Sequence, residues 1–351
     1  MLTFLAFLGV FGLLVLVHEM GHFTVAKLAG VRVLEFGMGF PPKLLRFRKG
    51  ETLYTLNAIP LGGFVKMAGE EDPSESRSLA GKPIPVRALV ISAGALMNIV
   101  LALVLFAVVF MVPKDMYIGD VRVTQVGENS PASAAGVLPG DIFRKVNGQQ
   151  IESLHDLSAQ FRLRTGAAAS VELERNGQPV KTSIVPRWKP PSGQGATGVV
   201  IEIANGHVVS SSKSFFPAFG AAARQLVETM VLMKNEVTSW FVGTSEPEFA
   251  GPIGIAQMTG EVAGLGFLPL LDLAALLSLN LGILNILPLP ALDGGRLFFI
   301  LVEVLRRGKR IPAKKEALVH LGGFVLLITT VLIISYFDIL RIVRGDSLLG
   351  G

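Results

Sequence analysis

The sequence has no cysteine and few charged residues. Without cysteine the protein can form no disulfide and can offer no thiolate to a metal, so a metal ion would have to be held by histidine and carboxylate side chains. Asp, Glu, Lys and Arg make up only 17% of the 351 residues, whereas 50% are hydrophobic. The mean hydropathy of +0.55 is too high for an ordinary water-soluble protein. These features predict an integral membrane protein.

Four apolar segments are long enough to cross a bilayer. They occupy residues 1–30, 88–112, 267–305 and 318–338, and the third is interrupted after Leu287 by two prolines. A cleaved signal peptide is the alternative for residues 1–17, but no basic region precedes this stretch and no small-residue cleavage pattern closes it. The predicted fold class is a multi-pass α-helical membrane protein with four transmembrane helices, a β-rich loop and an inserted α+β domain.

The distribution of basic residues predicts the orientation in the membrane. The net charge is +5, but the positive residues gather beside the apolar segments, which argues against nucleic acid as a partner and for a lipid bilayer. Residues 31–87 and 306–317 are therefore expected in the cytoplasm, and residues 113–266 outside it. The basic residues are Lys43, Arg46, Arg48, Lys49, Arg77, Lys82 and Arg87, then Arg306, Arg307, Lys309, Arg310, Lys314 and Lys315. Arg341 and Arg344, in the tail of residues 339–351, fit this orientation poorly.

The first apolar segment runs directly into the sequence His18-Glu19-Met20-Gly21-His22. Ionisable side chains at membrane depth are costly and are typical of a functional site, so ordinary surface polarity explains them poorly. On a helix, His18 and His22 project from the same face, close enough to share one metal ion. Glu19 lies beside them and could take a proton from a metal-bound water.

A catalytic zinc usually has three protein ligands, so a third ligand is needed. The best candidate is Asp293, which lies in the polar, helix-breaking interruption of the third apolar segment, between Asn285 and Gly295. An aspartate that caps a restarting helix is the alternative. Asp272 is a weaker candidate because it lies near the outer end of its segment. We do not expect ligands at His155, His207 or His320.

Residues 31–87 are expected to form a membrane-associated β-rich loop. Residues 31–34, 52–56 and 63–67 have the residue types and alternation of β-strands, and Gly37 and Gly39 flank Met38. A sheet edge beside an active site can accept an extended peptide as an added strand. A plain hairpin with glycines in its turns is an equally good interpretation.

The exported part is expected to contain one compact module at residues 113–188. Hairpin signals at Asn147-Gly148 and Asn176-Gly177 and a short helix at Ser130-Pro131-Ala132 predict at least five strands and two helices. A connector and an amphipathic helix follow at residues 189–266. The apolar stripe from Phe219 to Val237 favours a helix at the outer membrane interface, or alternatively a core helix packed on the module.

Taken together, these motifs resemble those of the site-2 proteases, in the bacterial branch that cleaves anti-sigma factors and signal-peptide remnants. The resemblance is carried by residues 18–22, 37–43, 59–65 and 285–295, and by a module that resembles a single PDZ domain. It implies a Zn2+ ion held by His18, His22 and Asp293, with Glu19 as the general base. It also implies that Asn285 contacts the substrate backbone. The implied substrate-pairing edge is Gly37, Met38, Gly39 and Phe40.

The expected function is intramembrane zinc-dependent proteolysis. The expected substrates are single-pass membrane proteins, and the expected location is the inner membrane with the active site towards the cytoplasm. A membrane scaffold with a structural metal and a recruiting PDZ module, and a metal transporter, are the alternatives. Two histidines and one aspartate could also hold iron or cobalt, and zinc is favoured by chemistry and availability. Many relatives have two PDZ domains and a longer exported region, so size selection of substrates inferred for them does not transfer directly.

Overall fold

A computed structural model of the chain describes residues 1–344 except 71, 192, 246 and 248. The chain divides into two compact units, which are described separately. The first comprises residues 1–109 and 249–351, and the second residues 110–248. Of the predicted tail at residues 339–351, residues 345–351 lie outside the described part of the chain.

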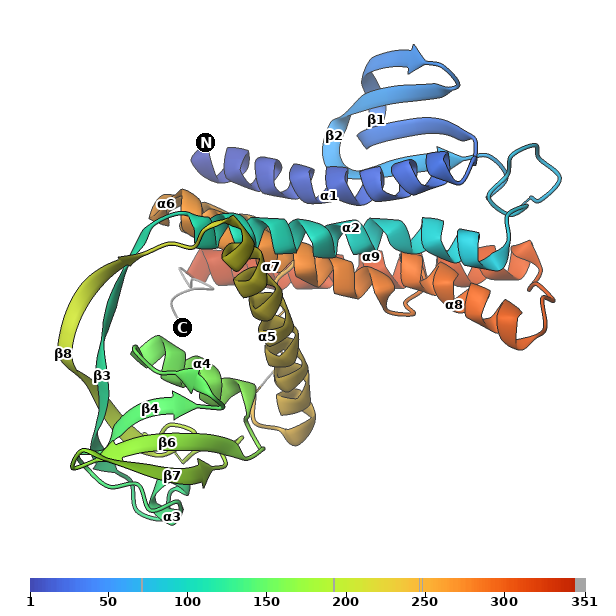
Figure 1. The fold of residues 1–351 in the computed structure, drawn as a ribbon. Coiled ribbons are helices and arrows are strands. Elements are labelled where there is room, and N and C mark those ends of the chain that lie inside the picture. Colours follow the sequence, from blue (N-terminus) through green and yellow to red (C-terminus); the bar gives the residue numbers. More distant parts are fainter. Residues whose placement is uncertain (71, 192, 246, 248, 345–351) are drawn as a thin grey trace. The chain divides into compact units, whose positions relative to one another are not determined.

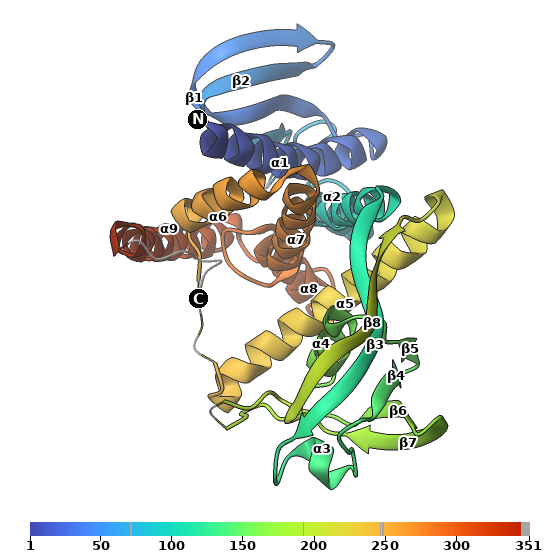
Figure 2. The same ribbon diagram turned by 90° about the vertical axis from the view of Figure 1, so that its left-hand side faces the viewer.

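The first unit is built from helices (Figure 1). Four of its described helices are long and apolar enough to cross a membrane: α1 (Leu2–Leu28), α2 (Ile84–Met111), α7 (Phe267–Ile286) and α9 (Ala313–Arg344). Two shorter helices, α6 (Pro252–Leu265) and α8 (Asp293–Leu305), complete the set. Figure 2 views the helices nearly end-on and shows α6 lying against α1, α7 and α9.

The helices agree with the four expected spans, and two of them begin earlier in the chain than expected. Helix α2 begins at Ile84 rather than residue 88, with Pro85 in its first turn, where a missing N–H costs nothing. Helix α9 begins at Ala313 and continues to Arg344, beyond residue 338. The third span consists of α7 and α8 separated by residues 287–292. Hydropathy detects only the apolar part of a helix, so its polar ends fall outside the expected bounds.

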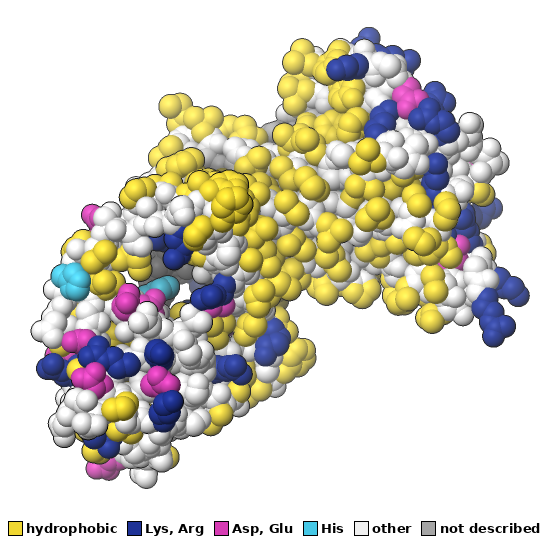
Figure 3. Space-filling model, in the orientation of Figure 1, with side chains coloured by type: hydrophobic (Ala, Val, Ile, Leu, Met, Phe, Trp, Pro, Cys, Tyr) yellow, Lys and Arg dark blue, Asp and Glu magenta, His cyan; other side chains and the backbone are white. Residues whose placement is uncertain are grey.

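Apolar side chains cover the outside of the helices. Leu326 and Leu332 on α9 are more than 60% exposed, and Figure 3 shows hydrophobic atoms spread over the helical region, with basic residues at the end that carries the β-strands. Such a surface suits lipid rather than water. Inside, Arg87 on α2 donates to Glu303 on α8 at 2.7 Å, and both side chains are 9% exposed. A buried charge of this kind is tolerated because it is paired. The first unit is therefore a membrane domain.

Two long strands, β1 (Val33–Lys49) and β2 (Thr52–Met67), form the sheet of the first unit. Both strands bend, so residues of β1 pair with more than one stretch of β2. Gly37 is paired with Phe64 on one side and Thr55 on the other, and Met38 with Gly63 and Leu56. The expectation that Gly37 and Met38 form a free edge is therefore wrong, because this part of β1 is interior to the sheet. The edge segment is residues 63–67 of β2, whose strand pairs among the described residues are all with β1.

The second unit is an antiparallel sheet with two short helices and one long helix. Its strands are β3 (Lys114–Val126), β4 (Ile142–Val146), β5 (Gln149–Gln150), β6 (Ala169–Arg175), β7 (Gln178–Ile184) and β8 (Val199–Ser211), and its helices are α3 (Pro131–Ala134), α4 (Leu154–Leu163) and α5 (Phe215–Val242). The strand order is β7-β6-β4-β3-β8, with β5 beside β4. The core contains Val121, Phe143, Leu157 and Leu173, all at most 1% exposed.

One feature of this unit differs from the expected domain bounds, and another concerns the expected amphipathic helix. Residues 199–211, expected in a connector, form β8 and pair with β3 along most of its length, so the sheet extends beyond residue 188. A strand that completes a sheet needs a distant partner, which local alternation does not reveal. Helix α5 contacts α4, because Asn235 donates to the carbonyl of Arg162 at 2.9 Å. This contact agrees with the alternative of a helix packed on the module, although Phe216 and Phe241 remain more than 80% exposed.

Candidate metal centre

Three side chains from two distant segments converge in the first unit. His18 and His22 lie one turn apart on α1, and Asp293 is the first residue of α8. Asp293 Oδ2 lies 3.2 Å from His18 Nε2 and 3.1 Å from His22 Nε2, and the two Nε2 atoms are 3.2 Å apart. One ion could contact all three atoms. Among the described residues, this group of three ligands is the one cluster of His, Asp and Glu side chains arranged to hold a metal.

Further contacts fix the two imidazole rings. The Nδ1 atom of His22 lies 2.8 Å from the carbonyl of Val90 on α2, to which it donates, so Nε2 is left unprotonated for a metal. The Nδ1 atom of His18 lies 3.3 Å from Nδ2 of Asn98. Asn98 Oδ1 is buried and has no partner among the described residues. A half-turn of the amide brings Oδ1 to His18 Nδ1–H, which satisfies both groups and leaves Nε2 of His18 free to bind.

The packing of α2 against α1 requires a glycine beside the imidazoles. A Cβ atom at Gly94 would lie 2.4 Å from His22 Nε2 and 2.7 Å from His18 Nε2. Both distances are too short for any side chain, so the position accommodates the two rings only as glycine. The two rings thus lie directly against the α2 backbone, with their Nε2 atoms turned towards Asp293.

The three ligands open into a cavity of about 420 Å³. Glu19 and the edge segment of β2 line it together with Ala291, Leu292 and Arg296. A Cβ atom at Gly63 would lie 2.8 Å from Glu19 Cγ, so the bare backbone of β2 passes directly beside the carboxylate chain. The donor set of two neutral imidazoles and one carboxylate, with an adjacent carboxylate and an open cavity, suits a divalent cation that must also contact a substrate.

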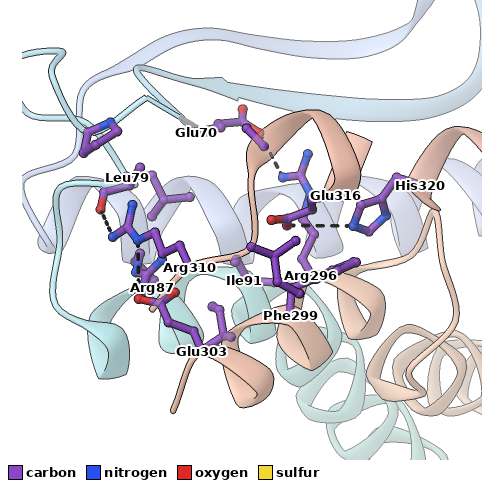
Figure 4. Close-up of a pocket in the computed structure, with 15 residues that line it drawn as sticks. Glu70, Leu79, Arg87, Ile91, Arg296, Phe299, Glu303, Arg310, Glu316 and His320 are labelled. Atoms are coloured by element: carbon purple, nitrogen blue, oxygen red, sulfur yellow. Dashed lines mark hydrogen bonds and ion pairs between the residues drawn. The ribbon is translucent and has the colours of Figure 1, made fainter. Parts of the chain in front are cut away.

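A second cavity of about 290 Å³ adjoins the first (Figure 4). Glu70, Ile91 and Arg296 line both cavities. Arg296 Nη1 donates to Glu70 Oε2 at 2.8 Å, so this ion pair belongs to the wall between them. The far end of the second cavity contains Glu303, which pairs with the buried Arg87 and with Arg310, whose side chain is 39% exposed.

The remaining predicted site residues lie elsewhere. Asn285 is buried near the C-terminal end of α7, and its amide donates to Leu281 O at 2.9 Å. Asn285 and residues 37–40 do not line the metal-site cavity, whose strand residues come from positions 63–67 instead. Asp272, His155, His207 and His320 are outside the three-ligand cluster.

Three parts of the site were not predicted from the sequence. Asn98 looks like an isolated polar residue in the second span, yet a buried amide at that depth is itself a signal of a partner. Gly94 carries no chemical signature at all. The Glu70–Arg296 pair joins residues 226 positions apart, and neither residue is unusual in its local sequence.

The chain was compared with known proteins. Residues 6–330 match peptidase family M50. A candidate zinc metalloprotease of Clostridium perfringens is 38% identical over 331 residues, which cover 94% of this chain and 96% of that protein. The zinc metalloprotease RasP of Geobacillus kaustophilus is 31% identical, with 96% and 97% covered, and the regulator of sigma-W protease RasP of Bacillus subtilis is 28% identical, with 97% and 99% covered.

One solved structure also shows a limited likeness. The PDZ domain of an SdrC-like protein from Listeria innocua is 21% identical and covers 25% of this chain and 99% of that chain, with a TM-score of 0.22. This likeness is too slight to establish the fold of the second unit.

Proposed function

The chain belongs to peptidase family M50, and we propose that His18, His22 and Asp293 hold its zinc ion while Glu19 transfers the proton. The protein is a zinc-dependent metalloprotease that hydrolyses peptide bonds within or near transmembrane segments. The observation that carries the assignment of residues is the convergence of two imidazole nitrogens and one carboxylate oxygen, all within 3.2 Å of one another.

The number of protein ligands also distinguishes a catalytic zinc site from a structural one. A structural zinc is closed by four protein ligands, whereas a catalytic zinc keeps a position open. The cluster has three members among the described residues, and it faces a cavity rather than packed side chains. These features favour catalysis over a structural metal in a membrane scaffold.

The residues around the centre have distinct tasks. Zinc, when bound, supplies Lewis acidity to water and to a peptide carbonyl. Glu19 accepts the proton of the attacking water and returns it to the leaving amine, a general acid–base role that needs a carboxylate next to the ligands. Val90 and Asn98 orient the rings of His22 and His18, so both nitrogens point at one place.

The substrate must be extended before it can be cleaved, because a helix hides its carbonyl groups in its own hydrogen bonds. Residues 63–67 of β2 line the cavity and pair on one side with β1, so their other side can accept an extended substrate strand. Backbone pairing with this edge would replace the hydrogen bonds lost when a substrate helix unwinds. Asn285 remains the candidate for a further substrate contact, which would require its amide to leave Leu281 O.

The substrates we propose are single-pass membrane proteins of the anti-sigma-factor type and signal-peptide remnants. The Bacillus subtilis relative is named as a regulator of sigma-W. The concentration of Lys and Arg in residues 31–87 and 306–317 supports a cytoplasmic position for the active site in the inner membrane. The second unit would then lie outside the cytoplasm, where its sheet and helices would act as a PDZ domain.

Replacing Glu19 with Gln tests the assignment. The Glu19→Gln variant should bind one zinc ion per chain, as the wild type does, because the three ligands are unchanged. Its cleavage of a membrane-embedded reporter in proteoliposomes should fall by about 1,000-fold or more, since general-base catalysis is lost. An Asp293→Ala variant is the control and should lose the zinc itself. Retained cleavage by Glu19→Gln would exclude Glu19 as the base.

A further inference from the structure

Helix α9 buries little of its surface within the first unit. None of the most apolar 18-residue stretch of α9 is buried, and Asp338 is its one buried residue within the described part of the chain. Asp338 Oδ2 accepts hydrogen bonds from the backbone N–H groups of Gly251 and Gly254 at the start of α6, at 2.9 and 2.8 Å. Near the other end of α9, His320 also accepts a backbone hydrogen bond, in this case from the loop between α7 and α8.

His320 contacts the loop that leads into the metal ligand. The N–H of Ala291 donates to His320 Nδ1 at 3.1 Å. Ala291 has a φ of +76°, a left-handed conformation that costs energy in any residue with a Cβ atom. Asp293 follows two residues later, and both residues line the metal-site cavity. The imidazole therefore accepts a hydrogen bond from a left-handed residue two positions before Asp293.

The same region of α9 lies very close to the loop. A Cβ atom at Gly323 would lie 2.2 Å from Pro290 Cβ and 2.8 Å from its carbonyl carbon, so α9 approaches the loop through a glycine. This approach places the His320 ring within reach of the Ala291 amide. Because Nδ1 accepts a hydrogen bond, the ring proton is on Nε2, which faces Glu316 Oε1 at 4.0 Å on the preceding turn (Figure 4).

We propose that His320 is a positioning residue for the metal centre. By accepting the Ala291 N–H, it holds the left-handed turn at residues 290–292 and so keeps Asp293 Oδ2 between the two histidines. The inference rests on the proposed function, because Asp293 must be a zinc ligand for its position to matter. It assigns to α9, which supplies no ligand, a direct influence on zinc affinity.

Three substitutions at position 320 distinguish the effect of the hydrogen-bond acceptor from the effect of side-chain volume. His320→Asn places Oδ1 near the position of Nδ1 and keeps the acceptor. His320→Leu has comparable volume and no acceptor, and His320→Gln offers its acceptor near the position of Nε2 instead. The measurements on the full-length protein in detergent are zinc affinity by competition with a chromophoric chelator, kcat and KM on a reporter, and hydrogen exchange of residues 287–292 without metal.

The variants should differ in zinc affinity, in kcat and in hydrogen exchange. His320→Leu should weaken zinc binding by about 10-fold or more and lower kcat with little change in KM, since outer contacts of metal sites typically have effects of this size. Exchange in residues 287–292 should be faster in this variant even without metal. His320→Asn should stay within about threefold of the wild type. If His320→Leu does not fold, His320→Gln should show the loss that His320→Asn avoids.

Asp338→Ala is the matched control, because it loosens α9 at its contact with α6. It should lower the thermal midpoint and leave zinc affinity unchanged. Equal zinc affinity in the wild type and in all His320 variants would overturn the proposal. So would equal weakening in His320→Asn, His320→Leu and Asp338→Ala, which would show that general docking of α9 is responsible. Failure of the wild type to bind one zinc would instead contradict the proposed function itself.

Discussion

The two units of the protein use polar and apolar residues in opposite ways. In the second unit, apolar side chains such as Phe143 and Leu173 are inside, and the charged ones lie mainly outside. In the first unit, apolar side chains cover the outside, and the polar groups His22, Asn98 and Asp338 are buried. Hydrophobicity therefore identifies the core of the second unit, whereas in the first unit the polar residues mark where the helices meet.

The largest expected effect comes from replacing Gly94 with Ala, which places a methyl group against the two imidazoles. In a Gly94→Ala variant the new Cβ would lie 2.4 Å from His22 Nε2, so the imidazoles must move. Zinc affinity and kcat/KM should each fall by about 100-fold, since displacements of about 1 Å have effects of this size. Calorimetric zinc binding and reporter cleavage would measure both.

Gly12→Ala on α1 is the matched control, since nothing lies within 4 Å of the position of its Cβ atom. It should leave both quantities unchanged. Normal zinc binding by Gly94→Ala would show that the close approach of α2 is not needed to hold the ligands.

A cavity in the core of the second unit should have a large effect on stability and none on the metal. Phe143 is fully buried and packs against Phe161 with ring centroids 5.9 Å apart. Phe143→Ala should lower the free energy of unfolding of the second unit by about 3–4 kcal/mol. Pulse proteolysis of the full-length protein would report this loss, and zinc binding should be unchanged. Loss of zinc binding in this variant would show that the metal centre depends on the core of the second unit.

A smaller effect is expected from the ion pair between the buried Asp141 and the partly exposed Arg175 in the second unit. Its side chain is 1% exposed and accepts from Arg175 Nε at 2.7 Å and from the Leu138 N–H at 2.9 Å. Asp141→Asn should lower the free energy of unfolding of this unit by about 2 kcal/mol, the size expected for charged hydrogen bonds. Lys145→Gln serves as a control, because its contact with Glu172 is exposed and 3.9 Å long.

The contribution of Asp141 should also depend on pH. Burial alone raises the pKa of Asp141, but the Arg175 guanidinium and the Leu138 N–H outweigh burial and hold the pKa below its ordinary value. Because the pKa is lower in the folded state, the contribution is complete above about pH 4 and is lost as the pH falls through the folded value. Wild-type stability should therefore fall more steeply below pH 4 than that of Asp141→Asn. Parallel curves would assign the acid sensitivity to other carboxylates.

The difference between the units also decides how much the sequence could predict. The four spans are visible as apolar runs, and His18, Glu19, His22 and Asp293 stand out because polar residues are rare at membrane depth. The free edge of the β-sheet is not visible in the sequence, since glycines occur at both Gly37 and Gly63 and only the pairing of β1 with β2 distinguishes them. Strand β8 was missed for the same reason, because its partner lies about 80 residues away.

Gly94 and His320 show a second limit. A glycine between apolar residues and a histidine at the start of a span each have many ordinary explanations, and only the close approach of a neighbouring backbone reveals their role. Local patterns therefore predict the chemistry of this centre, whereas the groups that orient it depend on how the helices pack.

The ligands that meet in the first unit are separated by 271 positions in the chain. During synthesis the two histidines enter the membrane early, but the carboxylate follows only after the whole second unit has been made. A ribosome-bound chain that has not reached Asp293 holds two of the three ligands and cannot complete the centre. With the proposed ligand set, the order of the polypeptide therefore postpones assembly of the metal centre until residue 293 has been made.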